Sequence, residues 1–152
     1  MQTRVLVPSG VLGLGFDSDA LARGVAAGPD IIAIDGGSTD SGPFYLGTGT
    51  SKYSRSVCRD EWRQLLEARA AAGVPLVIGS CGTCGTASTV DWMFEITCEL
   101  AAELGQTLRV ARLYSDVPVE ALRHARDADR LTPLDPAPAI DDAALAGMTN
   151  IV

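Results

Sequence analysis

Two short apolar runs, each followed directly by a glycine-rich stretch, constrain the fold of this chain more than any other feature. Residues 31–34 (Ile-Ile-Ala-Ile) precede the stretch 35–43, and residues 75–78 (Pro-Leu-Val-Ile) precede the stretch 79–86. Continuous apolar runs of this length are typical of strands buried in a parallel sheet. Because ligands bind beyond the carboxyl ends of such strands, we expect both glycine-rich stretches to line one crevice.

Strand-like and helix-like segments alternate along the chain. The apolar patterns predict strands over 4–7, 30–34, 74–78 and 108–113, and helices over 17–27, 57–72, 89–104 and 117–126. Such alternation favours right-handed crossovers between parallel strands. We therefore expect an α/β fold, a three-layer sandwich with a mostly parallel, Rossmann-like sheet of at least four strands. Residues 44–56 have no clear period and are expected to form a long loop.

The chain divides into an expected α/β domain over residues 1–131 and a proline-rich tail over 132–152. Three prolines between residues 132 and 139 are typical of a linker. The apolar run 148–152 has the pattern of a new strand. It predicts that a second half follows or that another polypeptide supplies it.

The net charge of −7, from 19 acidic and 12 basic residues, disfavours nucleic acids and anionic membranes as partners. A small anionic ligand remains compatible, because backbone amides and a few arginines can reverse the local field. The sequence begins without the pattern of a signal peptide and contains no apolar run of membrane-spanning length. We expect a soluble, cytoplasmic protein whose four cysteines are free thiols.

The 79–86 stretch is the first candidate ligand site. Glycines let a ligand approach the backbone, and the N-terminus of the following helix, with Ser88 as its expected cap, attracts anions. A carboxylate, a phosphate or a carbonyl oxygen is the natural ligand here, although a simple strand-to-helix turn also uses such residues. The candidate ligand-binding residues of this stretch are Gly79, Ser80, Gly82, Thr83 and Gly85.

Cys81 and Cys84 form a C-x-x-C pair within the same stretch. This spacing suits a redox dithiol, half of a zinc site, or a nucleophilic or acid–base thiol, and it is also compatible with passive small residues. A zinc site needs two further ligands, and His124 is the only histidine, so the sequence predicts no metal site. The sequence identifies no cofactor.

Carboxylates follow the first apolar run. Asp35 and Asp40 are placed to act as general bases, although Asp, Ser and Gly in such loops also serve turn geometry. An arginine in the long loop could pair with an anion in bidentate fashion. The other candidate ligand-binding residues around this crevice are Ser9, Gly10, Ser38, Thr39 and Arg55.

Three segments together resemble a known family. Residues 30–47 (DIIAIDGGSTDSGPFYLG), 51–55 (SKYSR) and 78–80 (IGS) are similar to the N-terminal region of the acyclic terpene utilisation (AtuA-like) family. The resemblance covers most of the chain to about residue 115. It implies a soluble α/β protein, normally longer than this chain, that is associated with the catabolism of branched acyl or carboxylic-acid compounds.

These observations lead to three alternative functions. The first is a lyase (a hydratase or dehydratase) or an isomerase that acts on a small carboxylate or acyl thioester. In that enzyme the 79–86 stretch holds the carboxylate or polarises the carbonyl, and Asp35 or Asp40 moves a proton. Arg55 orients a second anionic group, and Cys81 is an acid–base or nucleophilic thiol. The second is a non-catalytic ligand-binding or scaffold subunit, and the third is a thiol redox protein. The expected partners are a small anionic organic ligand and either further copies of the chain or a second subunit.

Overall fold

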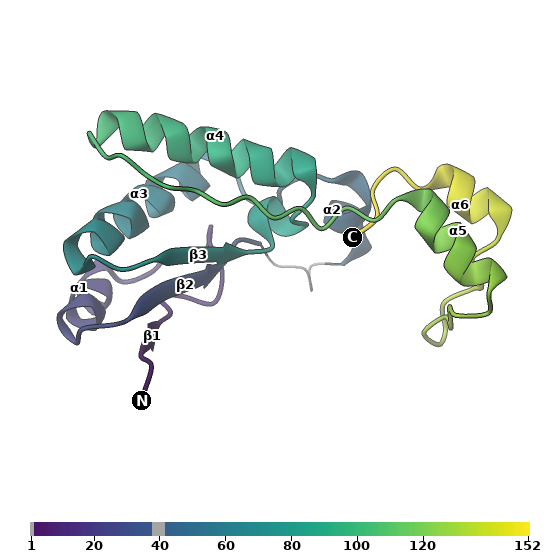
Figure 1. Cartoon of the computed structure of the whole chain (residues 1–152), viewed down its shortest axis with the longest axis horizontal. Helices are drawn as coiled ribbons and strands as arrows, with labels where there is room; N and C mark the ends of the chain where they lie inside the picture. Colours follow the sequence, from purple (N-terminus) through teal and green to yellow (C-terminus); the bar gives the residue numbers. More distant parts are fainter. Residues whose placement is uncertain (1, 38–41) are drawn as a thin grey trace.

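A computed structural model describes residues 2–37 and 42–152, and these residues form one parallel sheet with helices packed on it (Figure 1). The strands are β1 (Val5–Leu6), β2 (Ile31–Asp35) and β3 (Leu76–Gly79), in the order β1-β2-β3. Val5 pairs with Ile31, and Ala33 pairs with Val77. The central strand β2 therefore has a partner on both sides, whereas β3 has one free edge.

Three helices pack on the sheet: α1 (Ser18–Ala26), α3 (Arg55–Ala72) and α4 (Ala87–Glu103). Local signals explain where two of them begin. The side chain of Asp17 accepts a hydrogen bond from Ala20 N at 2.8 Å, and Ser54 caps α3 in the same way. Gly73 ends α3 in the left-handed conformation, with φ of 69°.

The hydrophobic core lies between one face of the sheet and these helices. Ile32 and Ile34 point from β2 into it and are 0% and 4% exposed. They pack in one cluster with side chains that are fully inaccessible to solvent on α3 and α4. These helix residues are Leu65, Ile96 and Leu100. Burial of large aliphatic side chains, each contributing about 1.5–3 kcal/mol, is what holds the two layers together.

The opposite face of the sheet is open. Val5 on β1 is 55% exposed and Val77 on β3 is 48% exposed, and Ala33 between them is only half-buried. A three-layer sandwich would cover these residues with a second layer of helices, which the described part of the chain does not supply. The expected three-layer architecture is therefore wrong, and the observed one has two layers.

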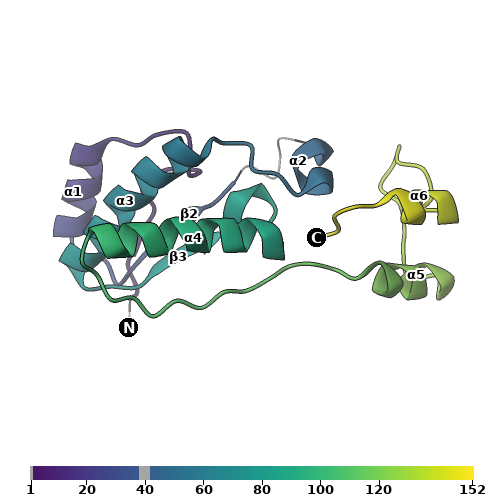
Figure 2. The same cartoon turned by 90° about the horizontal axis from the view of Figure 1, so that it is seen from above.

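The expected fourth strand over 108–113 is also absent. Residues 107–114 run extended past α4 and β3 (Figures 1 and 2) but belong to no strand. Side chains attach this segment to α4: Arg112 pairs with Asp91 at 2.7 Å and stacks on the Phe94 ring at 4.5 Å. The sheet therefore has three strands in the described residues, and the prediction of a Rossmann-like sheet of at least four strands is wrong.

The rest of the chain forms short helices. The region expected to be a loop contains α2 (Pro43–Thr48), and the C-terminal region contains α5 (Val119–Asp127) and α6 (Asp142–Gly147), which lie away from the sheet in both views (Figures 1 and 2). The last residues form no strand, contrary to expectation. They return to α2, where Thr149 Oγ1 donates to Gly47 O at 2.8 Å. Among the residues described, no helix has both the length and the apolar character needed to cross a bilayer.

Candidate functional site

The two glycine-rich stretches lie side by side at the carboxyl ends of β2 and β3. Asp35 is in register with Gly79, and Gly36 N donates to Gly79 O at 2.6 Å. Gly37 touches the second stretch so closely that an added Cβ would lie 2.2 Å from Thr83 Cα. The expectation that parallel pairing brings these stretches to one edge is confirmed.

The second half of the 79–86 stretch is packed against the rest of the protein. Residues 82–86 are all buried, and Thr83 is 0% exposed. The Thr83 hydroxyl accepts a hydrogen bond from Lys52 N at 3.1 Å, and a Cβ on Gly82 would lie 2.8 Å from Thr89 Cβ. Close packing between the stretches and α4 therefore accounts for much of the glycine content. Gly79 is exposed, while Ser80 is half-buried in a left-handed conformation with φ of 45°.

The N-terminus of α4 is occupied by the chain itself. The helix begins at Ala87, so Ser88 is not its cap, and Ala87 N donates to Asp116 Oδ2 at 2.8 Å. The neighbouring Ser115 donates through N to Gly85 O at 3.0 Å and through its hydroxyl to Cys84 O at 3.1 Å. Asp116 thus accepts from the first backbone amide of the helix at which the sequence predicted an anionic ligand.

The other candidate polar residues make local contacts. Asp35 Oδ1 accepts from Gly37 N at 3.1 Å, and the Ser9 hydroxyl bonds to Val11, each a turn within its own loop. Gly10 beside it is exposed. Arg55 lies at the start of α3 and pairs with Glu99 of α4 at 2.7 Å. The remaining candidates, Ser38, Thr39 and Asp40, lie outside the described residues.

The two thiols of the C-x-x-C pair face different partners. Cys81 Sγ contacts Ile78 O at 4.0 Å, whereas Cys84 Sγ contacts Tyr45 O at 3.7 Å, and both cysteines are free. Burial raises the pKa of the Cys81 thiol to about 11. A thiol with so high a pKa is almost entirely protonated near neutral pH, which disfavours nucleophilic and redox chemistry at Cys81.

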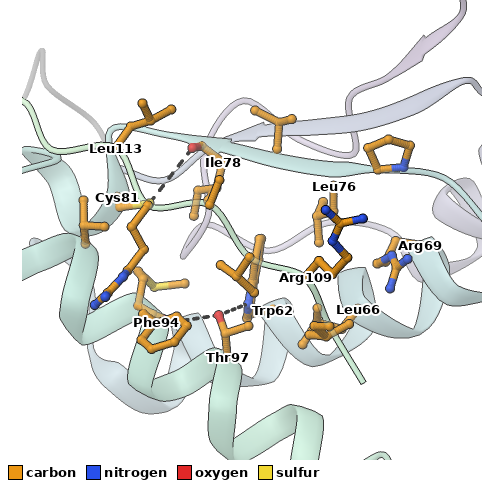
Figure 3. A pocket seen from close by; sticks show the side chains of 18 of the residues that line it. Trp62, Leu66, Arg69, Leu76, Ile78, Cys81, Phe94, Thr97, Arg109 and Leu113 are labelled. Atoms are coloured by element: carbon orange, nitrogen blue, oxygen red, sulfur yellow. Dashed lines mark hydrogen bonds between the residues drawn. The ribbon is translucent and has the colours of Figure 1, made fainter. Parts of the chain in front are cut away.

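A groove of about 600 Å³ opens beside β3 (Figure 3). We call it the β3–α4 groove; its walls are the free edge of β3, one side of α4, the C-terminal half of α3 and the extended segment 107–113. Its lining is largely apolar, from Trp62, Leu66, Leu76, Ile78, Met93 and Phe94. Among the candidate residues that the structure describes, Cys81 alone lines this groove.

Hydrogen bonds within the protein satisfy the polar groups at the bottom of the groove. Trp62 Nε1 donates to Thr97 Oγ1 at 2.9 Å, and that hydroxyl donates to Met93 O at 2.7 Å. The bottom of the groove is therefore suited to apolar atoms. Two arginines that line it, Arg69 and Arg109, lie at one end (Figure 3).

Sequence reasoning missed this groove because it exists only where segment 107–113 stays apart from β3. The one available signal was the pair of arginines within a segment assigned to a buried strand, Arg109 and Arg112, since buried strands seldom carry unpaired charges.

In residues 2–37 and 42–152, no three His, Cys, Asp or Glu side chains lie close enough together to hold a metal ion.

The chain matches no protein-family model, no curated protein and no solved structure in the three comparisons made. The resemblance to the AtuA-like family therefore stays a prediction from the quoted segments.

Proposed function

We propose that this chain is a ligand-binding module that holds a small organic acid or acyl compound in the β3–α4 groove. The observation that carries the proposal is a groove of about 600 Å³ with a mainly apolar lining. Sites for small molecules are typically concave and mostly apolar, with volumes of roughly 300–1,000 Å³. This is the ligand-binding alternative of the three functions considered from the sequence.

The chemistry of the site favours binding over catalysis. Proton transfer needs an acid or base within hydrogen-bond reach of the bound molecule. Asp35 is the last residue of β2, does not line the groove, and its carboxylate accepts a hydrogen bond from Gly37 N, while the Cys81 thiol inside the groove has a pKa raised to about 11. Neither group is suited to a lyase or isomerase step in the groove at neutral pH.

Fluorescence titration with the uncharged probe N-phenyl-1-naphthylamine tests the proposal. We expect saturable enhancement with the wild-type chain, and amide chemical-shift changes in NMR spectra that concentrate at residues 76–78, 90–97 and 107–113. Ala111→Trp places a large side chain at the wall of the groove and should weaken binding at least tenfold. The matched control is Ala121→Trp, at an exposed position on α5, which should bind as the wild type does. Shift changes confined to other regions, or no saturable binding, would exclude the groove as the site.

A further inference from the structure

We propose that Arg69 and Arg109 form the anion-recognition end of the β3–α4 groove, so that its ligand is a carboxylate carrying a medium-length apolar chain. This inference rests on the proposed function and adds to it the class of ligand, its direction in the groove and the residues that select it.

The first step is the pairing of charges. Arg55, Arg59 and Arg63 on α3 all pair with glutamates of α4, and Arg112 pairs with Asp91. Across the described residues, five arginines pair with no carboxylate, and two of these, Arg69 and Arg109, line the groove, whereas Arg4, Arg23 and Arg130 do not. Arg69 donates through Nε to Val74 O at 3.2 Å, and the guanidinium of Arg109 makes no hydrogen bond at all within this part of the chain.

The chain has an excess of carboxylates, with 19 acidic against 12 basic residues. A shortage of acidic partners therefore does not explain why Arg69 and Arg109 pair with none. Two guanidinium groups at one end of a groove repel each other, and an anion between them would relieve that repulsion. Guanidinium groups match carboxylates in bidentate geometry, which favours this anion over a merely diffuse counterion.

The second step is the direction of the groove. Arg69 and Arg109 lie at one end, and Cys81 and Leu113 lie at the other (Figure 3). Between the ends, the lining runs along β3, whose four residues span about 13 Å. A carboxylate at the arginine end would direct an acyl chain along β3 toward Cys81.

The third step is a consequence for the extended segment. Arg69 belongs to α3, whereas Arg109 belongs to segment 107–113, which joins the body of the protein mainly through its side chains and through Ser115. A carboxylate held by both arginines would connect this segment to α3. Ligand binding should therefore reduce the local motion of the segment.

The experiment compares decanoate with decanol, which has the same chain without the charge, by isothermal titration calorimetry. We expect the wild-type chain to bind both, with decanoate bound more tightly at low salt. Arg69→Gln and Arg109→Gln should each weaken decanoate binding about tenfold, a loss of about 1.4 kcal/mol, and leave decanol binding unchanged. The matched control is Arg130→Gln, an exposed arginine outside the groove, which should change neither affinity.

The outcomes separate this inference from the proposed function. If the wild type binds decanol and decanoate with equal affinity, or if both arginine variants bind decanoate as the wild type does, the inference is wrong and the groove remains a ligand site. If the variants lose decanol as strongly as decanoate, the arginines are structural and the inference is again wrong. If the wild type binds neither compound, both proposals fail.

Discussion

Glu61 provides the sharpest test of how the structure is held together. This carboxylate lies on α3, is only 6% exposed, and accepts hydrogen bonds from two backbone amides of the loop after β1. Gly13 N donates to Oε2 at 2.7 Å and Gly15 N donates to Oε1 at 2.8 Å. The side chain thus attaches the loop to the helix and uses both of its oxygens to do so.

The magnitude of a Glu61→Gln change follows from this geometry. Glutamine keeps one acceptor oxygen but places an NH₂ group against the second backbone N–H, so one bond is lost and two donors face each other. Hydrogen bonds to charged groups contribute about 1.5–3 kcal/mol each, and we expect Glu61→Gln to lower the free energy of unfolding by about 2 kcal/mol. Glu61→Ala removes both acceptors and should lower the free energy of unfolding by about 3 kcal/mol. The loss is no larger because Gly15 is exposed, so its amide can hydrogen-bond to water instead.

Urea unfolding followed by circular dichroism measures these differences, and limited proteolysis shows whether cleavage increases within residues 10–16. The matched control is Glu67→Gln, at an exposed position of the same helix, which should change the unfolding free energy by less than about 0.5 kcal/mol. Equal stabilities for Glu61→Gln and Glu67→Gln would refute the assignment of Glu61 as the attachment point of the loop.

Two further predictions concern titration. Hydrogen bonds from Arg63 and a second arginine of α3 lower the pKa of Glu103 below its ordinary value of 4.5. The contribution of Glu103 to stability is therefore complete above about pH 4.5 and is lost as the pH falls through the lowered pKa of the folded state. The difference in urea midpoint between the wild type and Glu103→Gln should therefore shrink below about pH 4.5, and a difference that stays constant with pH would contradict this. Because Cys81 is partly buried and its pKa is about 11, we expect iodoacetamide to modify it far more slowly than the exposed Cys98 at pH 8. The rate at Cys81 should then rise roughly tenfold per pH unit up to about pH 10. Peptide mass spectrometry measures both rates, and equal rates at pH 8 would show that the thiol is not buried as described.

Short-range patterns in the sequence were sufficient to predict β2, β3 and the three helices that pack on them. Helical spacing of apolar residues identified α3, and Gly73 identified its end, because these signals act within a few residues. The meeting of the two glycine-rich stretches was also predictable, since parallel pairing brings the ends of neighbouring strands to one edge.

The errors about the sheet depend on contacts between distant residues. An apolar, extended segment such as 108–113 has the local pattern of a strand whether or not it pairs. Its attachment to α4 through Arg112, and to the 84–87 turn through Ser115 and Asp116, keeps it beside β3 without joining the sheet. The segment either pairs with β3 or is held beside it by these side-chain contacts. The free-energy difference between the two arrangements decides which one forms, and no local pattern encodes that difference.

The location of the candidate site has the same origin. Gly37 packs against Thr83 where the two glycine-rich stretches meet, and the separation between β3 and segment 107–113 opens a groove that no motif marks. Residue types and their periodicity were enough to identify the elements and the edge at which their loops meet. The shape of the space between those elements depends on how side chains far apart in the chain pack, and so it became known only from the folded structure.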